Sequence, residues 1–125
     1  MDYNWEGKSI AVVDDEEINF ILIKKQLEKT KANIFWLENG QEIVNYIVGG
    51  KEVDLILMDI RMPLMDGFEA TKRIKKIRPE IPIIFQTAYI IGTEFDMIKN
   101  SQCDDFIIKP IDANKLIKLI DKHFE

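Results

Sequence analysis

Several residue types and patterns are scarce in this sequence, and each shortage excludes a class of protein. The chain of 125 residues has one cysteine, Cys103, and one histidine, His123. It can therefore form neither an internal disulfide nor a zinc site of cysteine and histidine ligands. No apolar run approaches the ~20 residues that a membrane helix needs, and the first residues lack the basic and apolar regions of a signal peptide. We expect a cytoplasmic protein with no membrane contact by this domain.

Basic charge is also in short supply. Lysine and arginine number 17 against 22 aspartate and glutamate, which gives a formal net charge of -5 and a pI of about 5.0. The lysines are scattered, so no segment presents the basic face that attracts a nucleic acid or an anionic membrane. What the chain does contain, 46% hydrophobic and 31% charged residues, is typical of one globular domain with a full core. We expect no nucleic-acid partner.

Five short apolar runs alternate with segments of helical spacing. The runs lack a strict alternation of polar and apolar residues, as expected for strands that are buried on both faces. They are Ile10–Val13, Asn33–Leu37, Leu55–Met58, Ile83–Phe85 and Phe106–Ile108. Strands that alternate with helices predict a parallel sheet with right-handed crossovers, covered by helices on both faces. The fold class is therefore α/β, a single (βα)5 doubly wound domain with a five-stranded sheet.

The segments between these runs carry apolar residues three and four positions apart, and we interpret the isoleucine-rich stretches as core. A first helix is expected from Glu16 to Lys29. Its helical spacing is marked by Ile18, Ile21 and Leu22. Asp112 is the expected N-cap of the last helix, and Asp66 that of the third. Residues 1–8 are mostly polar, so we interpret them as a leader or linker remnant that precedes a domain of residues 9–125.

Carboxylates end two of the expected strands. Asp14 and Asp15 follow the run Ile10–Val13, and Asp59 follows Leu55–Met58. If these strands are neighbours, the three acids converge at the carboxyl edge of the sheet, where open α/β sheets bind ligands. Like charges this close cannot all stay ionised unless a cation joins them. The pattern predicts a divalent-metal site around Asp59. For Asp14 and Asp15 alone, helix capping is the alternative.

Five separated elements of the sequence, taken in order, resemble the receiver domain of two-component response regulators. They are Val13-Asp14-Asp15-Glu16, the segment from Met58 to Gly67, Thr87-Ala88, Asp104-Asp105-Phe106 and Lys109-Pro110. The resemblance covers essentially all of residues 8 to 125. It implies a flavodoxin-like sheet with strand order 2-1-3-4-5. The opening around Trp5 and the pattern that ends at Asn19 are most similar to receivers of hybrid sensor histidine kinases.

The resemblance implies a signalling domain that catalyses only its own phosphorylation and slow self-dephosphorylation. Asp59 would be the phosphoacceptor, served by a histidine kinase or a histidine phosphotransfer protein. Lys109 and Thr87 would contact the phosphoryl oxygens. Thr87 and Phe106 would form the switch that repacks the face of the fourth helix, fifth strand and fifth helix. In this family the peptide bond before Pro110 is usually cis.

The resemblance also implies a cofactor and a lifetime for the phosphorylated state. Mg2+, which Mn2+ can replace, would be held by oxygen ligands. These are Asp14, Asp15, Asp59 and the backbone carbonyl of Arg61. Arg61 and Tyr89 follow Asp59 and Thr87 by two residues each, and both side chains are bulky. We interpret them as a shield that slows hydrolysis of the phosphoryl group.

Three other functions compete for the same residues. A phosphatase of the haloacid-dehalogenase type needs a second aspartate two residues after the acceptor, where this chain has Arg61. A flavin-binding electron carrier needs a phosphate loop after the first strand, where Asp14 and Asp15 would repel a phosphate. A degenerate receiver used only for docking would not need the full set of acceptor residues. The sequence leaves open whether this is a stand-alone regulator or a domain of a hybrid kinase.

Overall fold

The computed structural model describes residues 3–88 and 92–124. The strands are β1 Ser9–Val13, β2 Asn33–Leu37, β3 Leu55–Asp59, β4 Ile83–Thr87 and β5 Asp105–Ile108. The helices are α1 Glu17–Leu27, α2 Gly40–Val48, α3 Gly67–Ile77, α4 Thr93–Asn100 and α5 Ala113–His123, with a short 3-10 turn, Glu28–Thr30, after α1. In this part of the chain, every helix is too short or too polar to cross a bilayer.

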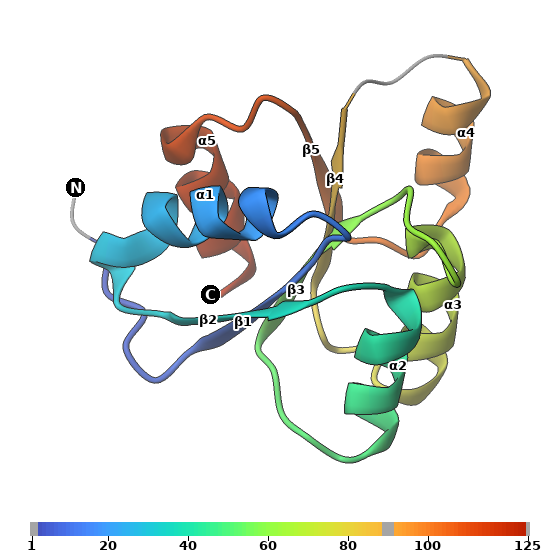
Figure 1. Ribbon diagram of the computed structural model, residues 1–125, viewed down its shortest axis with the longest axis horizontal. Coiled ribbons are helices and arrows are strands. Elements are labelled where there is room, and N and C mark those ends of the chain that lie inside the picture. The colour runs from blue at the N-terminus through green and yellow to red at the C-terminus, as the bar shows by residue number, and fades with distance from the viewer. Residues whose placement is uncertain (1–2, 89–91, 125) are drawn as a thin grey trace.

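The sheet lies between two layers of helices, with α1 and α5 on one face and α2, α3 and α4 on the other (Figure 1). All strand pairs are parallel, and the order is β2-β1-β3-β4-β5. The (βα)5 fold and the strand order 2-1-3-4-5 are thereby confirmed. In the register, Val13 lies between Leu37 and Met58, so the ends of β1 and β3 meet at one edge.

Successive strand residues point to opposite faces and supply two separate cores. In β4, Ile83 and Phe85 belong to the core under α2, α3 and α4, whereas Ile84 belongs to the core under α1 and α5. These side chains are fully buried. Each contributes roughly 1.5–3 kcal/mol to the free energy of folding. The sheet is therefore held from both sides, which fixes the positions of its strand ends.

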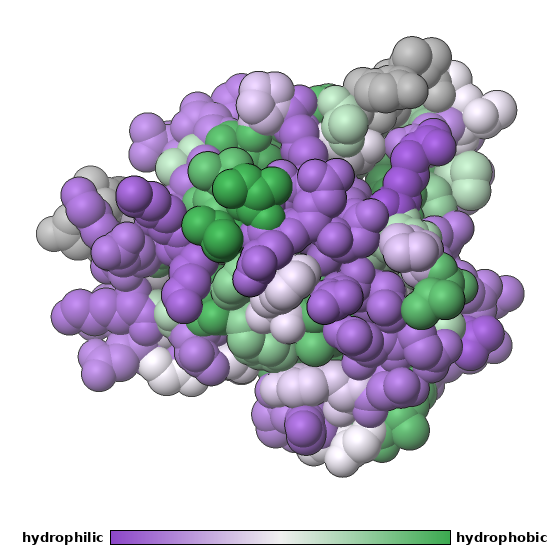
Figure 2. Space-filling view, in the orientation of Figure 1, coloured by the Kyte–Doolittle hydropathy of each residue, from purple (hydrophilic) through white to green (hydrophobic). Residues whose placement is uncertain are grey.

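The buried side of α1 differs from the prediction that its isoleucine-rich stretch is core. Ile18, Ile21 and Leu22 are exposed, while Ile23 and Leu27 are buried against the sheet. Figure 2 shows hydrophobic side chains gathered over α1 on an otherwise largely hydrophilic face. The periodicity located the helix correctly. It did not identify the face, because the helix carries two apolar stripes and only the one with Ile23 and Leu27 joins the core between the helix and the sheet.

The segment interpreted as a leader packs against the domain. The side chain of Trp5 is 4% exposed, its Nε1 donates to Asp121 Oδ1 at 3.2 Å, and its ring meets Phe124 edge to face at 5.2 Å. Its backbone nitrogen also donates to the carbonyl of Thr30 at 2.7 Å. Residue 5 is thus tied to the C-terminal ends of both α1 and α5. The domain boundary at residue 8 stays a prediction.

The predicted helix caps are confirmed. The Asp66 carboxylate accepts a hydrogen bond from the backbone nitrogen of Glu69 at 2.9 Å, and Asp112 accepts one from Asn114 at 3.0 Å. Each bond satisfies one of the amide groups that a helix start leaves without a partner. α3 and α5 therefore begin at defined residues, close to the carboxyl edge of the sheet.

Candidate functional site

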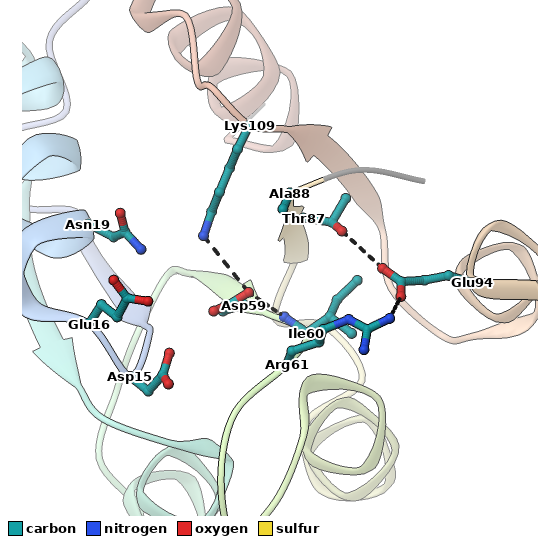
Figure 3. Close-up of a pocket in the computed structure, with 10 residues that line it drawn as sticks. All are labelled: Asp15, Glu16, Asn19, Asp59, Ile60, Arg61, Thr87, Ala88, Glu94 and Lys109. Atoms are coloured by element: carbon teal, nitrogen blue, oxygen red, sulfur yellow. Dashed lines mark hydrogen bonds and ion pairs between the residues drawn. The ribbon is translucent and has the colours of Figure 1, made fainter. Parts of the chain in front are cut away.

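An open depression of about 340 Å³ lies at the carboxyl edge of the sheet (Figure 3). Asp15, Asp59, Arg61, Thr87 and Lys109 all line it, although they come from four different segments. Each of these residues was a candidate on sequence grounds. Tyr89, which was a candidate together with Arg61 as a shield, lies outside the described residues.

Asp14, Asp15 and Asp59 form one carboxylate cluster, with an oxygen of each within 4.8 Å of the others. Asp14 is fully buried. Its Oδ1 accepts from the backbone nitrogen of Glu16 at 2.9 Å and from the Asn19 amide at 3.3 Å. Its Oδ2 is buried and has no hydrogen-bond partner among the described residues. An oxygen-only donor set that includes a buried carboxylate oxygen without a hydrogen bond in the described part of the chain fits a hard divalent cation.

The protonation of Asp59 reflects these surroundings. Burial raises the pKa of its carboxyl to about 6, the Lys109 ammonium opposes the rise, and Asp14 adds to it. The Lys109 Nζ lies 4.0 Å from Asp59 Oδ1 and 3.6 Å from Asp14 Oδ2. One ammonium therefore faces more than one carboxylate. This excess of negative charge leaves the site able to gain a further cation.

Lys109 is held by the adjoining ends of β4 and β5. Its backbone nitrogen donates to the carbonyl of Thr87 at 2.7 Å, which extends the pairing of the two strands by one residue. The peptide bond between Lys109 and Pro110 is cis, as the resemblance implied. The ammonium reaches over the sheet edge toward Asp59 (Figure 3).

Gly67 begins α3 directly behind Asp59. A Cβ at this position would lie 2.4 Å from the backbone oxygen of Asp59 and 2.9 Å from the Cα of Ile60. The Gly67 nitrogen also donates to the Ile60 carbonyl at 2.8 Å. Position 67 needs glycine because of this close approach of two backbone segments.

Thr87, at the end of β4, contacts a residue that sequence reasoning missed. Its hydroxyl donates to Glu94 Oε1 at 3.1 Å, and the other oxygen of Glu94 pairs with Arg61 Nη2 at 2.5 Å. Glu94 lies in the first turn of α4 and lines the depression. An acid in the first turn of a helix is common, so the sequence held no signal for this bridge.

Phe106 lies in β5, three residues before Lys109 and outside the lining of the depression. It is half-buried at the edge of the core under α2, α3 and α4, and its ring meets that of Phe95 in α4 edge to face at 6.5 Å. Phe95 directly follows Glu94 in the chain. Phe106 thus contacts α4 by ring packing, and its role as a switch stays a prediction.

A doubly wound sheet of this order, with three carboxylates, a lysine and a hydroxyl at its carboxyl edge, defines the receiver class of signalling domains. The chain belongs to the response regulator receiver domain family, whose profile matches residues 10–121. Members of this class are phosphoacceptor domains of two-component systems, and that is the general function of this chain.

Two curated relatives of this chain are sensor kinases. The chain is 35% identical over 113 residues to the autoinducer 1 sensor kinase/phosphatase LuxN of Vibrio harveyi, covering 90% of this chain and 13% of that protein. It is 34% identical over 118 residues to the sensor protein GacS of Pseudomonas syringae, again covering 90% and 13%. The chain therefore spans about an eighth of the length of these relatives.

Two solved structures have the same architecture. The receiver domain of the sensor histidine kinase PA1611 from Pseudomonas aeruginosa superimposes with a TM-score of 0.84 at 25% identity, covering 92% of this chain and 95% of that one. That structure holds a magnesium ion coordinated in its active-site cleft. A CheY-like receiver domain protein from Methanospirillum hungatei gives a TM-score of 0.83 at 27% identity, covering 92% and 91%.

Proposed function

We propose that Asp59 accepts a phosphoryl group from the phosphohistidine of a histidine kinase or a histidine phosphotransfer protein. One carboxylate oxygen of Asp59 attacks phosphorus, the bond between phosphorus and the histidine nitrogen breaks, and the imidazole leaves with that electron pair. The product is an aspartyl phosphate. The observation that carries the proposal is the position of Asp59, at the end of β3, with Lys109 4.0 Å from its Oδ1 and two further acids beside it.

The carboxylate cluster fits Mg2+, or Mn2+ in its place. Asp14, Asp15, Asp59 and the backbone carbonyl of Arg61 would hold the ion. It would neutralise negative charge on the phosphoryl oxygens, which is the main demand of phosphoryl transfer. The buried Asp14 Oδ2, which has no hydrogen-bond partner in the described part of the chain, supports this assignment. The magnesium ion in the related PA1611 receiver gives it further support.

Lys109 and Thr87 complete the acceptor site. The Lys109 ammonium points toward Asp59 (Figure 3), where it would pair with a phosphoryl oxygen as a point charge. The Thr87 hydroxyl would donate to another oxygen. Phe106 would then repack as Thr87 moves. Phe106 has no hydroxyl, so packing alone would set the balance between its rotamers.

The sensor-kinase relatives support a histidine-containing partner for this chain. The phosphatase alternative gains no support from the site, because the Arg61 side chain, in the place of a second acid, pairs with Glu94. A docking-only role gains none either, since Asp14, Asp15, Asp59 and Lys109 are brought together.

The test is intact mass after treatment with acetyl phosphate and Mg2+. Wild-type protein is expected to gain the mass of one phosphoryl group, and Asp59→Asn is expected to gain none. Asp66→Asn is the matched control, because Asp66 is a nearby acid that caps α3, and it is expected to label like wild type. Equal labelling of wild type and Asp59→Asn, or labelling that survives EDTA, would sink the proposal.

A further inference from the structure

Glu94 holds two residues of the acceptor site at once. One of its carboxylate oxygens accepts the hydroxyl of Thr87 at 3.1 Å, and the other pairs with Arg61 at 2.5 Å. The Glu94 side chain is 14% exposed, whereas that of Arg61 is 78% exposed. In Figure 3 the carboxylate lies between the two partners at the rim of the depression, on the side opposite Asp15. An exposed arginine is thus anchored by a largely buried acid.

The bond between Thr87 and Glu94 conflicts with the role that the proposed function gives to Thr87. A hydroxyl has one proton and donates to one acceptor at a time. While Glu94 accepts that proton, a phosphoryl oxygen on Asp59 cannot. A carboxylate is moreover a strong acceptor, because hydrogen bonds to charged groups are stronger than neutral ones. Glu94 therefore competes directly with the phosphoryl group.

Charge works in the same direction. Glu94 and Asp59 line the same depression, so a phosphoryl group on Asp59 would bring further negative charge toward the Glu94 carboxylate. Like charges that share a site repel each other. Phosphorylation would thus weaken the hold of Glu94 on Thr87. It would also offer the Arg61 guanidinium a second anionic partner.

A helix-stabilising role alone does not account for this arrangement. Glu94 and Asp96 are both acids in the first turn of α4, where either one interacts favourably with the helix dipole. Asp96 does so while exposed, without lining the acceptor depression. Glu94 instead turns toward the site and contacts Thr87 and Arg61. Asp96 is therefore a matched control for the charge effect on the helix.

We propose that Glu94 is a positioning residue that holds Thr87 and Arg61 in the unphosphorylated arrangement and has to release them when Asp59 is phosphorylated. This inference rests on the proposed function of Asp59. It also implies a route by which phosphorylation of Asp59 is transmitted from the site to α4. Release of Glu94 frees the first turn of α4, and the next residue, Phe95, packs on Phe106. The link between the acceptor site and α4 thus runs through a carboxylate, in a chain whose residue 106 has no hydroxyl.

The test uses beryllium trifluoride, which mimics the phosphoryl group on an aspartate, at saturating Mg2+, with binding followed by fluorine NMR. Glu94→Gln keeps the shape of the side chain and removes its charge. It is expected to bind beryllium trifluoride about five- to tenfold more tightly than wild type. Its labelling by acetyl phosphate is expected to be faster by a similar factor. Asp96→Asn is expected to match wild type within about twofold.

A double-mutant cycle separates positioning from simple charge. In a Thr87→Val background the hydroxyl is gone, so most of the gain from Glu94→Gln is expected to disappear. An equal gain in both backgrounds would overturn the proposal, because Glu94 would then act by its charge alone. No gain in the wild-type background would overturn it as well. If wild type itself binds no beryllium trifluoride, the proposed function of Asp59 fails instead, and the two failures are distinguishable.

Discussion

Asp59 is one of the acids at the carboxyl edge of the sheet, and burial raises the pKa of its carboxyl to about 6. In the unfolded chain this pKa returns to about 3.9. Without metal, the Asp59 carboxyl is therefore largely protonated in the folded state and largely ionised in the unfolded state between about pH 4 and pH 6. Ionised Asp59 destabilises the fold above pH 6, and this destabilisation disappears as the pH falls toward 4.

We therefore expect Asp59→Asn to be more stable than wild type in EDTA above pH 6. The gain should be about 1–2 kcal/mol, after allowance for the solvent that reaches the carboxyl. The gap should close as the pH falls to about 4. Urea unfolding of both proteins from pH 4 to 8 measures it, with Asp96→Asn as an exposed control. A gap that stays constant across this range would contradict the assignment of the raised pKa.

At the scale of single residues, the sequence predicted which side chains meet at the candidate site wherever position along a strand decides it. Asp14, Asp59, Thr87 and Lys109 end or directly follow strands, so parallel pairing brings them to one edge whatever their rotamers. Glu94 could not be found in this way. Its contact depends on where α4 starts and on which way one long side chain turns, and neither follows from strand order.

At the scale of elements, a buried lysine joins three segments that the sequence alone does not connect. The Lys75 Nζ, on α3, donates to the carbonyls of Pro79 and Ile81 at 3.1 and 2.7 Å. It also pairs with Asp104 Oδ2 at 2.7 Å. Asp104 in turn accepts from the backbone nitrogen of Ile83 at 2.8 Å. The end of α3 and the starts of β4 and β5 are fastened at one point.

We expect Lys75→Met to lower the free energy of unfolding by about 2–3 kcal/mol, because it leaves the partly exposed Asp104 carboxylate without its ion-pair partner and the carbonyls of Pro79 and Ile81 without their donor. Lys72→Met, one turn earlier and exposed, should change it by no more than about 0.5 kcal/mol. Urea unfolding compares the three proteins. Similar losses in both variants would mean that the pair of Lys75 and Asp104 contributes no more to the free energy of unfolding than an exposed lysine does.

The elements themselves were largely predictable, and the exception has a physical cause. The boundaries of each expected strand lie within two residues of the observed ones. Short apolar runs without alternation are typical of strands that are buried on both faces, so the pattern locates them well. α1 was found, but its core face was not. Ile18 and Ile21 share the helix with Ile23 and Leu27, and helical spacing alone does not say which stripe the sheet will cover.

At the scale of the whole molecule, the packing of Trp5 bears on where the folded domain begins. Residues 1–8 were interpreted as a leader or linker remnant, and a remnant of that kind would contribute nothing to stability. Yet Trp5 is almost fully buried in the core under α1 and α5. It contacts Phe124, which lies at the other end of the chain. We propose that the folded unit starts before Trp5, and that the Trp5 ring covers the α1/α5 layer at the C-terminal ends of these two helices.

Replacement of Trp5 by alanine would leave a cavity beside Phe124 and remove the hydrogen bond to Asp121. We expect Trp5→Ala to lose about 3–5 kcal/mol of unfolding free energy, and a chain that starts at residue 9 to lose a similar amount. Glu6→Ala, in the same segment but exposed, is the control and should stay within about 0.5 kcal/mol of wild type. Urea unfolding of all four proteins decides between the two boundaries. If the chain of residues 9–125 is as stable as the full chain, the leader interpretation holds and the packing of Trp5 is dispensable.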